Sequence, residues 1–123
     1  MPLYPGTGAR NERGEHNTVV NAPLSPGDGG PEFRAALESV ILSRIRDFRP
    51  DLIIISAGFD AHAADPLAQL EVETEDFDWL TRELMAIAQR HAGGRLVSVL
   101  EGGYDLQALA ESVASHVRIL MGD

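Results

Sequence analysis

The chain contains neither cysteine nor lysine among its 123 residues. Without cysteine it has no disulfides, no thiolate ligands for a metal and no cysteine nucleophile. No apolar run approaches the roughly 20 residues that cross a bilayer. The N-terminus lacks the basic region and the apolar core of a signal peptide. These absences predict a cytoplasmic protein that does not bind membranes.

Positive charge is also scarce. Ten scattered arginines face nineteen acids, which gives a formal net charge of −9. A nucleic-acid interface needs a basic patch, so we expect no nucleic-acid partner. With 44% hydrophobic and 24% charged residues, the composition is that of a globular protein, and the length allows one domain at most.

The first half of the chain predicts a loop, a strand, a helix and a second strand. The polar residues 1–17 indicate the loop, and "TVVNAPL" (18–24) a short strand. Apolar residues at helical spacing predict an amphipathic helix over about 31–48, which Pro50 ends. The apolar run 52–56 is continuous, as in a parallel strand that is covered on both faces.

The second half continues the alternation. Thr74 is predicted to cap a helix that ends at Gly93-Gly94, and "RLVSVL" (95–100) reads as another buried strand. Asp105 is predicted to cap a last helix. Its expected buried stripe is Leu106, Leu109, Val113, Val117 and Leu120. The order over 18–123 is β-α-β-α-β-α, which predicts an α/β fold with a parallel sheet.

Ligands of open α/β sheets bind beyond the carboxyl ends of the strands. "SAGFDAHAADP" follows the strand at 52–56, and "EGGYD" follows the strand at 95–100. If these strands are neighbours, Asp60 and Tyr104 approach one crevice. Asp60 is either a metal ligand or an acid that closes the loop or caps a helix. If the segment is extended, the side chains of His62 and Asp60 share a face and can both bind the metal. If the chain turns here, the two side chains point apart.

The second loop also leaves alternatives open. Its glycines, Gly102 and Gly103, permit a close approach of the backbone to a ligand. Tyr104 can donate a hydrogen bond to a polarised carbonyl, or pack beneath the loop. Glu101 is either an acid of the active site or a buried acid at a strand end, bonded to backbone amides.

These segments resemble a known family. "YPGTG" (4–8), "NAPL" (21–24), "RPDLIIISAGFDAHAADPLAQL" (49–70) and "LEGGYDL" (100–106) are similar, in this order and spacing, to the C-terminal part of the histone deacetylase family. That family includes deacetylase-like amidohydrolases of bacteria and acetylpolyamine amidohydrolases, and "LEGGY" resembles its class II and bacterial branch. The resemblance implies the three-layer, arginase-like α/β fold, with the chain, 1–123, as its C-terminal portion.

The resemblance also implies a chemistry. Family members use zinc to activate water against an N-acetyl amide, such as acetyl-lysine or a small acetyl-amide. It assigns Asp60 as a zinc ligand and Tyr104 as the residue that stabilises the oxyanion. The residues it places around the substrate are Tyr4, Gly58, Phe59, Leu67, Gly102 and Gly103. An apolar residue at Leu67 argues against the glutamate gate of polyamine-specific members.

One departure from the family pattern stands out. The family's other two zinc ligands, an Asp-x-His motif, and its His-His base lie upstream of "YPGTG", and this sequence has no His-His pair. We therefore expect a truncated gene product, a fragment or one piece of a split enzyme, inactive alone, with apolar surface or an open sheet edge exposed. Two alternatives are a self-associating half-fold, hence a homo-oligomer, and a new metal site built from Asp60 and His62.

Overall fold

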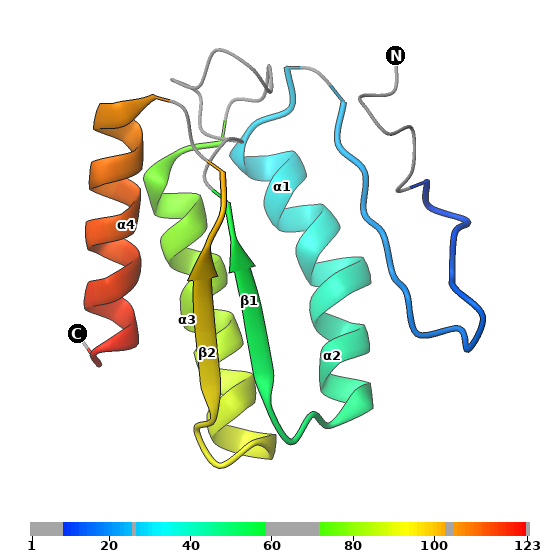
Figure 1. Ribbon diagram of the computed structural model, residues 1–123. Coiled ribbons are helices and arrows are strands. Elements are labelled where there is room, and N and C mark those ends of the chain that lie inside the picture. Colours follow the sequence, from blue (N-terminus) through cyan, green and yellow to red (C-terminus); the bar gives the residue numbers. More distant parts are fainter. Residues whose placement is uncertain (1–8, 26, 59–71, 103–104, 123) are drawn as a thin grey trace.

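The computed structural model describes residues 9–25, 27–58, 72–102 and 105–122 (Figure 1). Its elements, in chain order, are α1 (Gly30–Ala36), the π-helical η1 (Leu37–Leu42), α2 (Ser43–Phe48), β1 (Ile53–Ala57), α3 (Thr74–His91), β2 (Leu96–Leu100) and α4 (Leu106–Leu120). No helix within these ranges is long and apolar enough to cross a membrane.

The sheet consists of β1 and β2, which run parallel and side by side (Figure 1). Their register pairs Ile53 with Leu96 at one end and Ala57 with Leu100 at the other. Helix α3 connects the two strands, as the β-α-β order requires. The predicted α/β fold with a parallel sheet is confirmed.

The predicted helix at 31–48 is confirmed as one helical segment, but it contains the π-helical η1. A π turn accommodates an extra residue, so the side chains beyond it are rotated relative to an α-helix. Consequently Leu42 is fully buried, Ile41 is only partly buried, and Phe48 at the end of the segment is 73% exposed. Arg49, in the left-handed conformation (φ 53°), ends the segment.

Of the two predicted helix caps, Asp105 is confirmed and Thr74 is not. Asp105 is the N-cap of α4, and its Oδ1 accepts a hydrogen bond from the Ala108 N–H at 2.8 Å. The prediction for Thr74 was wrong, because Thr74 is already the first residue of α3 and Glu73 is its N-cap. The Asp76 carboxylate then accepts a hydrogen bond from the Glu73 N–H at 3.0 Å, which satisfies an amide at the helix start.

The strand predicted at 18–24 is absent from the structure. This extended segment runs beside α2 (Figure 1), and Arg44 donates a hydrogen bond to the Asn17 carbonyl at 3.1 Å. The Asn21 amide bonds the carbonyls of Ala9 and Glu12, at 3.0 and 3.3 Å. A strand forms only with a hydrogen-bonded neighbour, and here side chains rather than a sheet hold the segment.

The core lies between one face of the sheet and the helices. One buried cluster comprises Leu42, Ile53, Leu84, Ile87, Ala88 and Ala92. A second comprises Phe33, Ala57, Val72 and Phe77. Among the described residues, the helices pack on this face alone, and Figure 1 shows α3 behind the strands. The described chain therefore contains the sheet and one helical layer.

The other face of the sheet is bare. Ile54 is 67% exposed on β1, and Val97 and Val99 are 50% and 54% exposed on β2. Burial thus alternates along β1 instead of being continuous, so the prediction of a strand covered on both faces was wrong for this chain. The expectation that apolar surface is exposed is confirmed.

The predicted stripe of helix α4 is confirmed in part, since Leu109 and Val113 pack against the second cluster, but the helix is rotated away from the rest of it. Its buried residues are Ala108, Ser112, His116 and Ile119. Leu106 and Val117, expected in the core, are 80% and 44% exposed. The small and polar side chains let α4 approach α3 closely. Hydrogen bonds fix this orientation: the Thr74 and Ser112 hydroxyls are 3.4 Å apart, and Ser115 donates to Asp78 at 2.8 Å.

Candidate active-site edge

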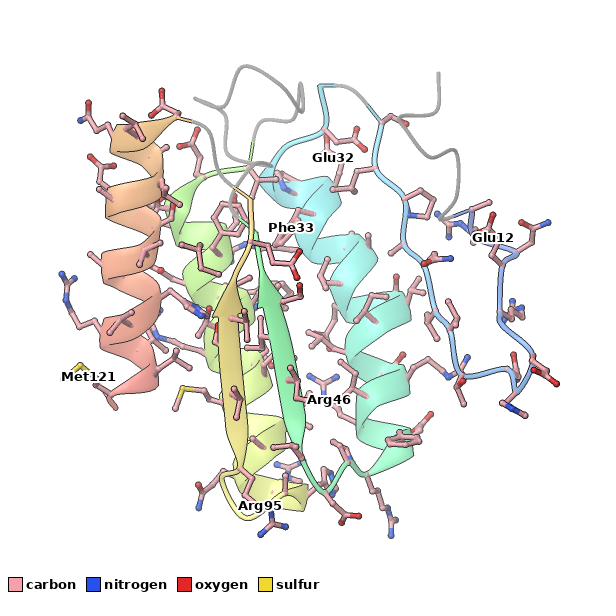
Figure 2. All side chains as sticks on the ribbon, in the orientation of Figure 1. Glu12, Glu32, Phe33, Arg46, Arg95 and Met121 are labelled. Atoms are coloured by element: carbon pink, nitrogen blue, oxygen red, sulfur yellow. The ribbon has the colours of Figure 1, made fainter. Side chains whose placement is uncertain are left out.

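The carboxyl ends of β1 and β2 meet at one edge of the sheet. Ala57 is paired with Leu100, and the Glu101 N–H donates a hydrogen bond to the Ala57 carbonyl at 2.8 Å. The two loops singled out in the sequence therefore start from adjacent, parallel strands, which was the condition for Asp60 and Tyr104 to approach one crevice. Arg95, labelled in Figure 2, marks the opposite edge.

A polar pair joins the two strands at this edge. The Ser56 hydroxyl donates a short hydrogen bond to the carboxylate of Glu101. Glu101 is exposed, so the interpretation as a buried acid bonded to backbone amides was wrong. Ser56 and Glu101 lie on the same bare face as Ile54 and Val99. The Glu101 carboxylate therefore lies where this face meets the carboxyl ends of the strands. No pattern in the sequence indicated Ser56, since its pairing with Glu101 depends on the register of two strands.

Of the predicted site residues, Gly58 and Gly102 lie at this edge, directly beyond the strands. The remaining predicted site residues fall outside the described residues: Tyr4, Phe59, Asp60, His62, Leu67, Gly103 and Tyr104. Their assignments stay predictions. Gly58 and Gly102 are both half-buried, so the two loops start close to the core.

A complete zinc centre does not fit the described part of the chain. Within those residues no three His, Asp or Glu side chains are grouped closely enough to hold a metal ion. A catalytic zinc takes three protein ligands and keeps one position open. A zinc centre in this protein would therefore need ligands from beyond the described residues.

One histidine lies in a hydrogen-bonded network away from this edge. His116 Nε2 is 2.8 Å from the Ser98 hydroxyl, and Nδ1 is 2.9 Å from the Thr81 hydroxyl. Thr81 already donates its proton to the Phe77 carbonyl at 2.8 Å, so it accepts from Nδ1–H. In the neutral imidazole, Nε2 then accepts a hydrogen bond from the Ser98 hydroxyl.

This network joins β2, α4 and α3. Burial lowers the pKa of His116 below its usual value, and the nearby Asp78 carboxylate offsets part of that shift. The arrangement of Ser98 and His116 is that of a hydroxyl beside a base, but it sits between the sheet and two helices, away from the carboxyl-end loops. We therefore assign it to packing. The sequence indicated only a helical histidine, because its two partners come from other elements.

Comparison with known proteins identifies the family. Residues 1–120 match the family described as "Histone deacetylase domain". The chain belongs to the histone deacetylase family. It is 43% identical to the protein slr0245 of Synechocystis, over 98% of this chain and 38% of that protein. It is also 43% identical to rice "Histone deacetylase 10, chloroplastic", over 98% of this chain and 28% of the rice protein.

Solved deacetylase structures share the fold. The crystal structure of the HDA15 HD domain matches 98% of this chain with a TM-score of 0.89 and 35% identity, and the match covers 34% of that chain. The resemblance seen in the sequence motifs and its fold are thereby confirmed. This deacetylase-family chain spans about a third of the length of the relatives it matches.

Proposed function

We propose that this chain is the C-terminal part of a zinc-dependent deacetylase that hydrolyses N-acetyl amides, with acetyl-lysine or a small acetyl-amide as its substrate. The observation that carries the proposal is the parallel pairing of β1 and β2 within a chain of this family. That pairing starts the Asp60 loop and the Tyr104 loop from adjacent strands. Ligands of parallel α/β sheets bind at this edge.

Each loop contributes one chemical group. Asp60 supplies a carboxylate ligand to the zinc, which, in a complete centre, polarises the substrate carbonyl and its attacking water. Tyr104 donates its phenol proton in a hydrogen bond to the substrate oxygen and stabilises the oxyanion of the tetrahedral intermediate. The glycines beside Tyr104 let the backbone approach the substrate, and Tyr4 and Leu67 line its apolar stem.

The family resemblance assigns the general base to a His-His pair, which this sequence does not contain. Its four histidines, His16, His62, His91 and His116, include no adjacent pair. His116 is occupied by Ser98 and Thr81. The proposed function therefore requires a second stretch of polypeptide that carries the base and the other zinc ligands, either linked to this chain or separate from it.

The test is a deacetylation assay in two settings. The 123-residue chain with zinc and an acetyl-lysine peptide is expected to show no turnover. Activity is expected when the chain is co-expressed with the part of slr0245 that it does not match. In that pair, Tyr104→Phe should lower kcat by roughly 10²–10³-fold, the usual effect of removing an oxyanion donor. Asp60→Ala should abolish zinc binding, measured by metal analysis.

A control variant and two opposing outcomes make the assay decisive. Met121→Gln, on the exposed end of α4, should leave the turnover of the pair unchanged. Turnover by the chain alone that Tyr104→Phe removes would show that the chain is a complete enzyme. Full turnover of the pair carrying Tyr104→Phe would overturn the role of that tyrosine.

A further inference from the structure

Three arginines line one cavity of this acidic chain. The cavity has a volume of about 320 Å³ and lies between the loop at 10–13 and the helical turns at 39–44. Arg10 and Arg13 line it from the loop, and Arg44 lines it from α2. Among the described residues of its lining none is acidic, although the whole chain has nineteen acids and only ten arginines. This local excess of positive charge favours an anion.

The guanidinium groups of the two loop arginines are available to a ligand. The side chains of Arg10 and Arg13 form no ion pair within the described chain, where the ion pairs belong to Arg34 and Arg46. Arg44 uses Nη2 to bond a backbone carbonyl at 3.1 Å and pairs with no acid among the described residues. Since a guanidinium has five N–H donors, most of those of Arg44 remain for a second partner.

Neutral contacts hold the loop in place beside the cavity. The Asn21 side-chain amide donates hydrogen bonds to the carbonyls of Ala9 and Glu12 (labelled in Figure 2), at 3.0 and 3.3 Å. The Val19 N–H donates to the Arg13 carbonyl at 3.0 Å. These bonds fix the backbone that carries the two loop arginines. The site is therefore formed before a ligand arrives, which lowers the entropic cost of binding.

The lining favours one class of anion. A carboxylate offers two oxygens, which a single guanidinium fork can bind, whereas a phosphoryl group offers three acceptor oxygens. Three arginines therefore suit a phosphoryl group better. The Ser39 and Ser43 hydroxyls in the lining already donate to helix carbonyls, so the arginines carry the recognition.

The size of the cavity and the charge of the chain limit the rest of the ligand. At about 320 Å³ the cavity is near the lower end of ligand pockets, which span roughly 300–1,000 Å³. A small phosphorylated molecule fits this space. A long polyanion such as a nucleic acid is a poorer ligand, because beyond the cavity it meets a chain with a formal net charge of −9.

We propose that this cavity binds the phosphoryl group of a small molecule, held by Arg10, Arg13 and Arg44. Asn21 is a positioning residue, because its amide fixes the loop that carries two of these arginines. None of the described lining residues belongs to β1, β2 or the loops that follow them. The inference goes beyond the proposed function and does not depend on it.

The experiment titrates pyrophosphate into the 123-residue chain at low salt and follows the NMR shifts of amides around the cavity. Arg10→Gln, Arg13→Gln and Arg44→Gln should each weaken binding by roughly tenfold, the usual effect of losing a charge-assisted hydrogen bond. Arg10→Gln removes no contact within the described chain, so its loss of binding does not come from unfolding. Arg118→Gln removes the same charge from an exposed site on α4 and should bind normally.

A neutral substitution separates a preformed site from general electrostatic attraction. Asn21→Ala keeps the charge but releases the loop, so it should weaken binding by about fivefold, the equivalent of one hydrogen bond. Asn11→Ala is the matched control, because Asn11 lies on the same loop but does not line the cavity. It should bind like the parent chain.

Three results would overturn the proposal. They are amides that pyrophosphate does not shift, an Arg118→Gln variant that binds as weakly as the three lining variants, and an Asn21→Ala variant that binds like the parent chain. Citrate, which carries three carboxylates and no phosphoryl group, tests the class of ligand. Weaker binding of citrate than of pyrophosphate supports a phosphoryl site, and equal binding would refute it.

Discussion

Replacing Gly30 with alanine should destabilise the protein, although the same substitution in a helix is ordinarily stabilising. Gly30 is the first residue of α1, where alanine normally stabilises a helix by up to about 1 kcal/mol. A Cβ on Gly30 would lie 2.6 and 2.7 Å from the two carboxylate oxygens of Asp76. Asp76 is buried and has its own partners, so it cannot move aside without losing them.

The expected cost follows from those partners. The Asp76 carboxylate bonds Arg34 Nε at 2.8 Å and the Glu73 N–H at 3.0 Å. Loss of the helix cap costs about 1 kcal/mol. The ion pair adds only about 0.5 kcal/mol, because the Arg34 side chain is 43% exposed and solvent screens the pair. A buried carboxylate left poorly bonded costs a further 1–3 kcal/mol or so. After the helix gain is subtracted, Gly30→Ala should destabilise by about 2 kcal/mol.

Urea unfolding followed by circular dichroism measures this loss. With a slope of about 2 kcal/mol/M, the midpoint of Gly30→Ala should fall by about 1 M. The matched control is the same substitution in Asp76→Ala, where the clash is gone and the added methyl group should be neutral or stabilising. The reasoning is refuted if Gly30→Ala stabilises the chain, or if it costs the same in both backgrounds.

Three further predictions concern the core and the His116 network. Leu42→Ala, at a fully buried site, should lower the free energy of unfolding by about 2–5 kcal/mol, and Phe48→Ala by under about 1, measured by the same denaturation. Because the folded pKa of His116 is lowered, its contribution is full above about pH 6.5 and is lost as the pH falls towards the folded pKa. His116→Asn should therefore flatten the decline of stability between pH 7 and 5. Ser98→Ala removes the donor to Nε2 and should raise the pKa of His116, as NMR titration can show.

Local chemistry made part of this fold predictable. Asp105 caps α4 through its own side chain, and the helix over 74–91 follows from apolar spacing and the Gly93-Gly94 stop. The order of elements then implied that β1 and β2 are parallel. Because that pairing fixes the shared edge, the location of the candidate site could also be predicted from the sequence.

The failures have a common cause, which is that burial depends on neighbours. The apolar run at 52–56 predicted cover on both faces, but the described chain packs only one. The segment 18–24, followed by turn residues, was predicted to be a strand, but the described part of the chain offers no adjacent strand to pair with it. Leu106 and Val117 fit a helical stripe as well as Ala108 and His116 do. The hydrogen bonds that Ser112, Ser115 and His116 make to neighbouring elements decide which side faces inwards.

The π turn of η1 lowers the stability of this chain. One extra residue in Leu37–Leu42 turns Phe48 out of the core, where it lines an open apolar hollow beside the start of β1. We expect that removing one residue from this turn would restore a continuous α-helical stripe and stabilise the chain by itself. The same deletion would turn Phe48 back towards the core and narrow the apolar hollow that it lines.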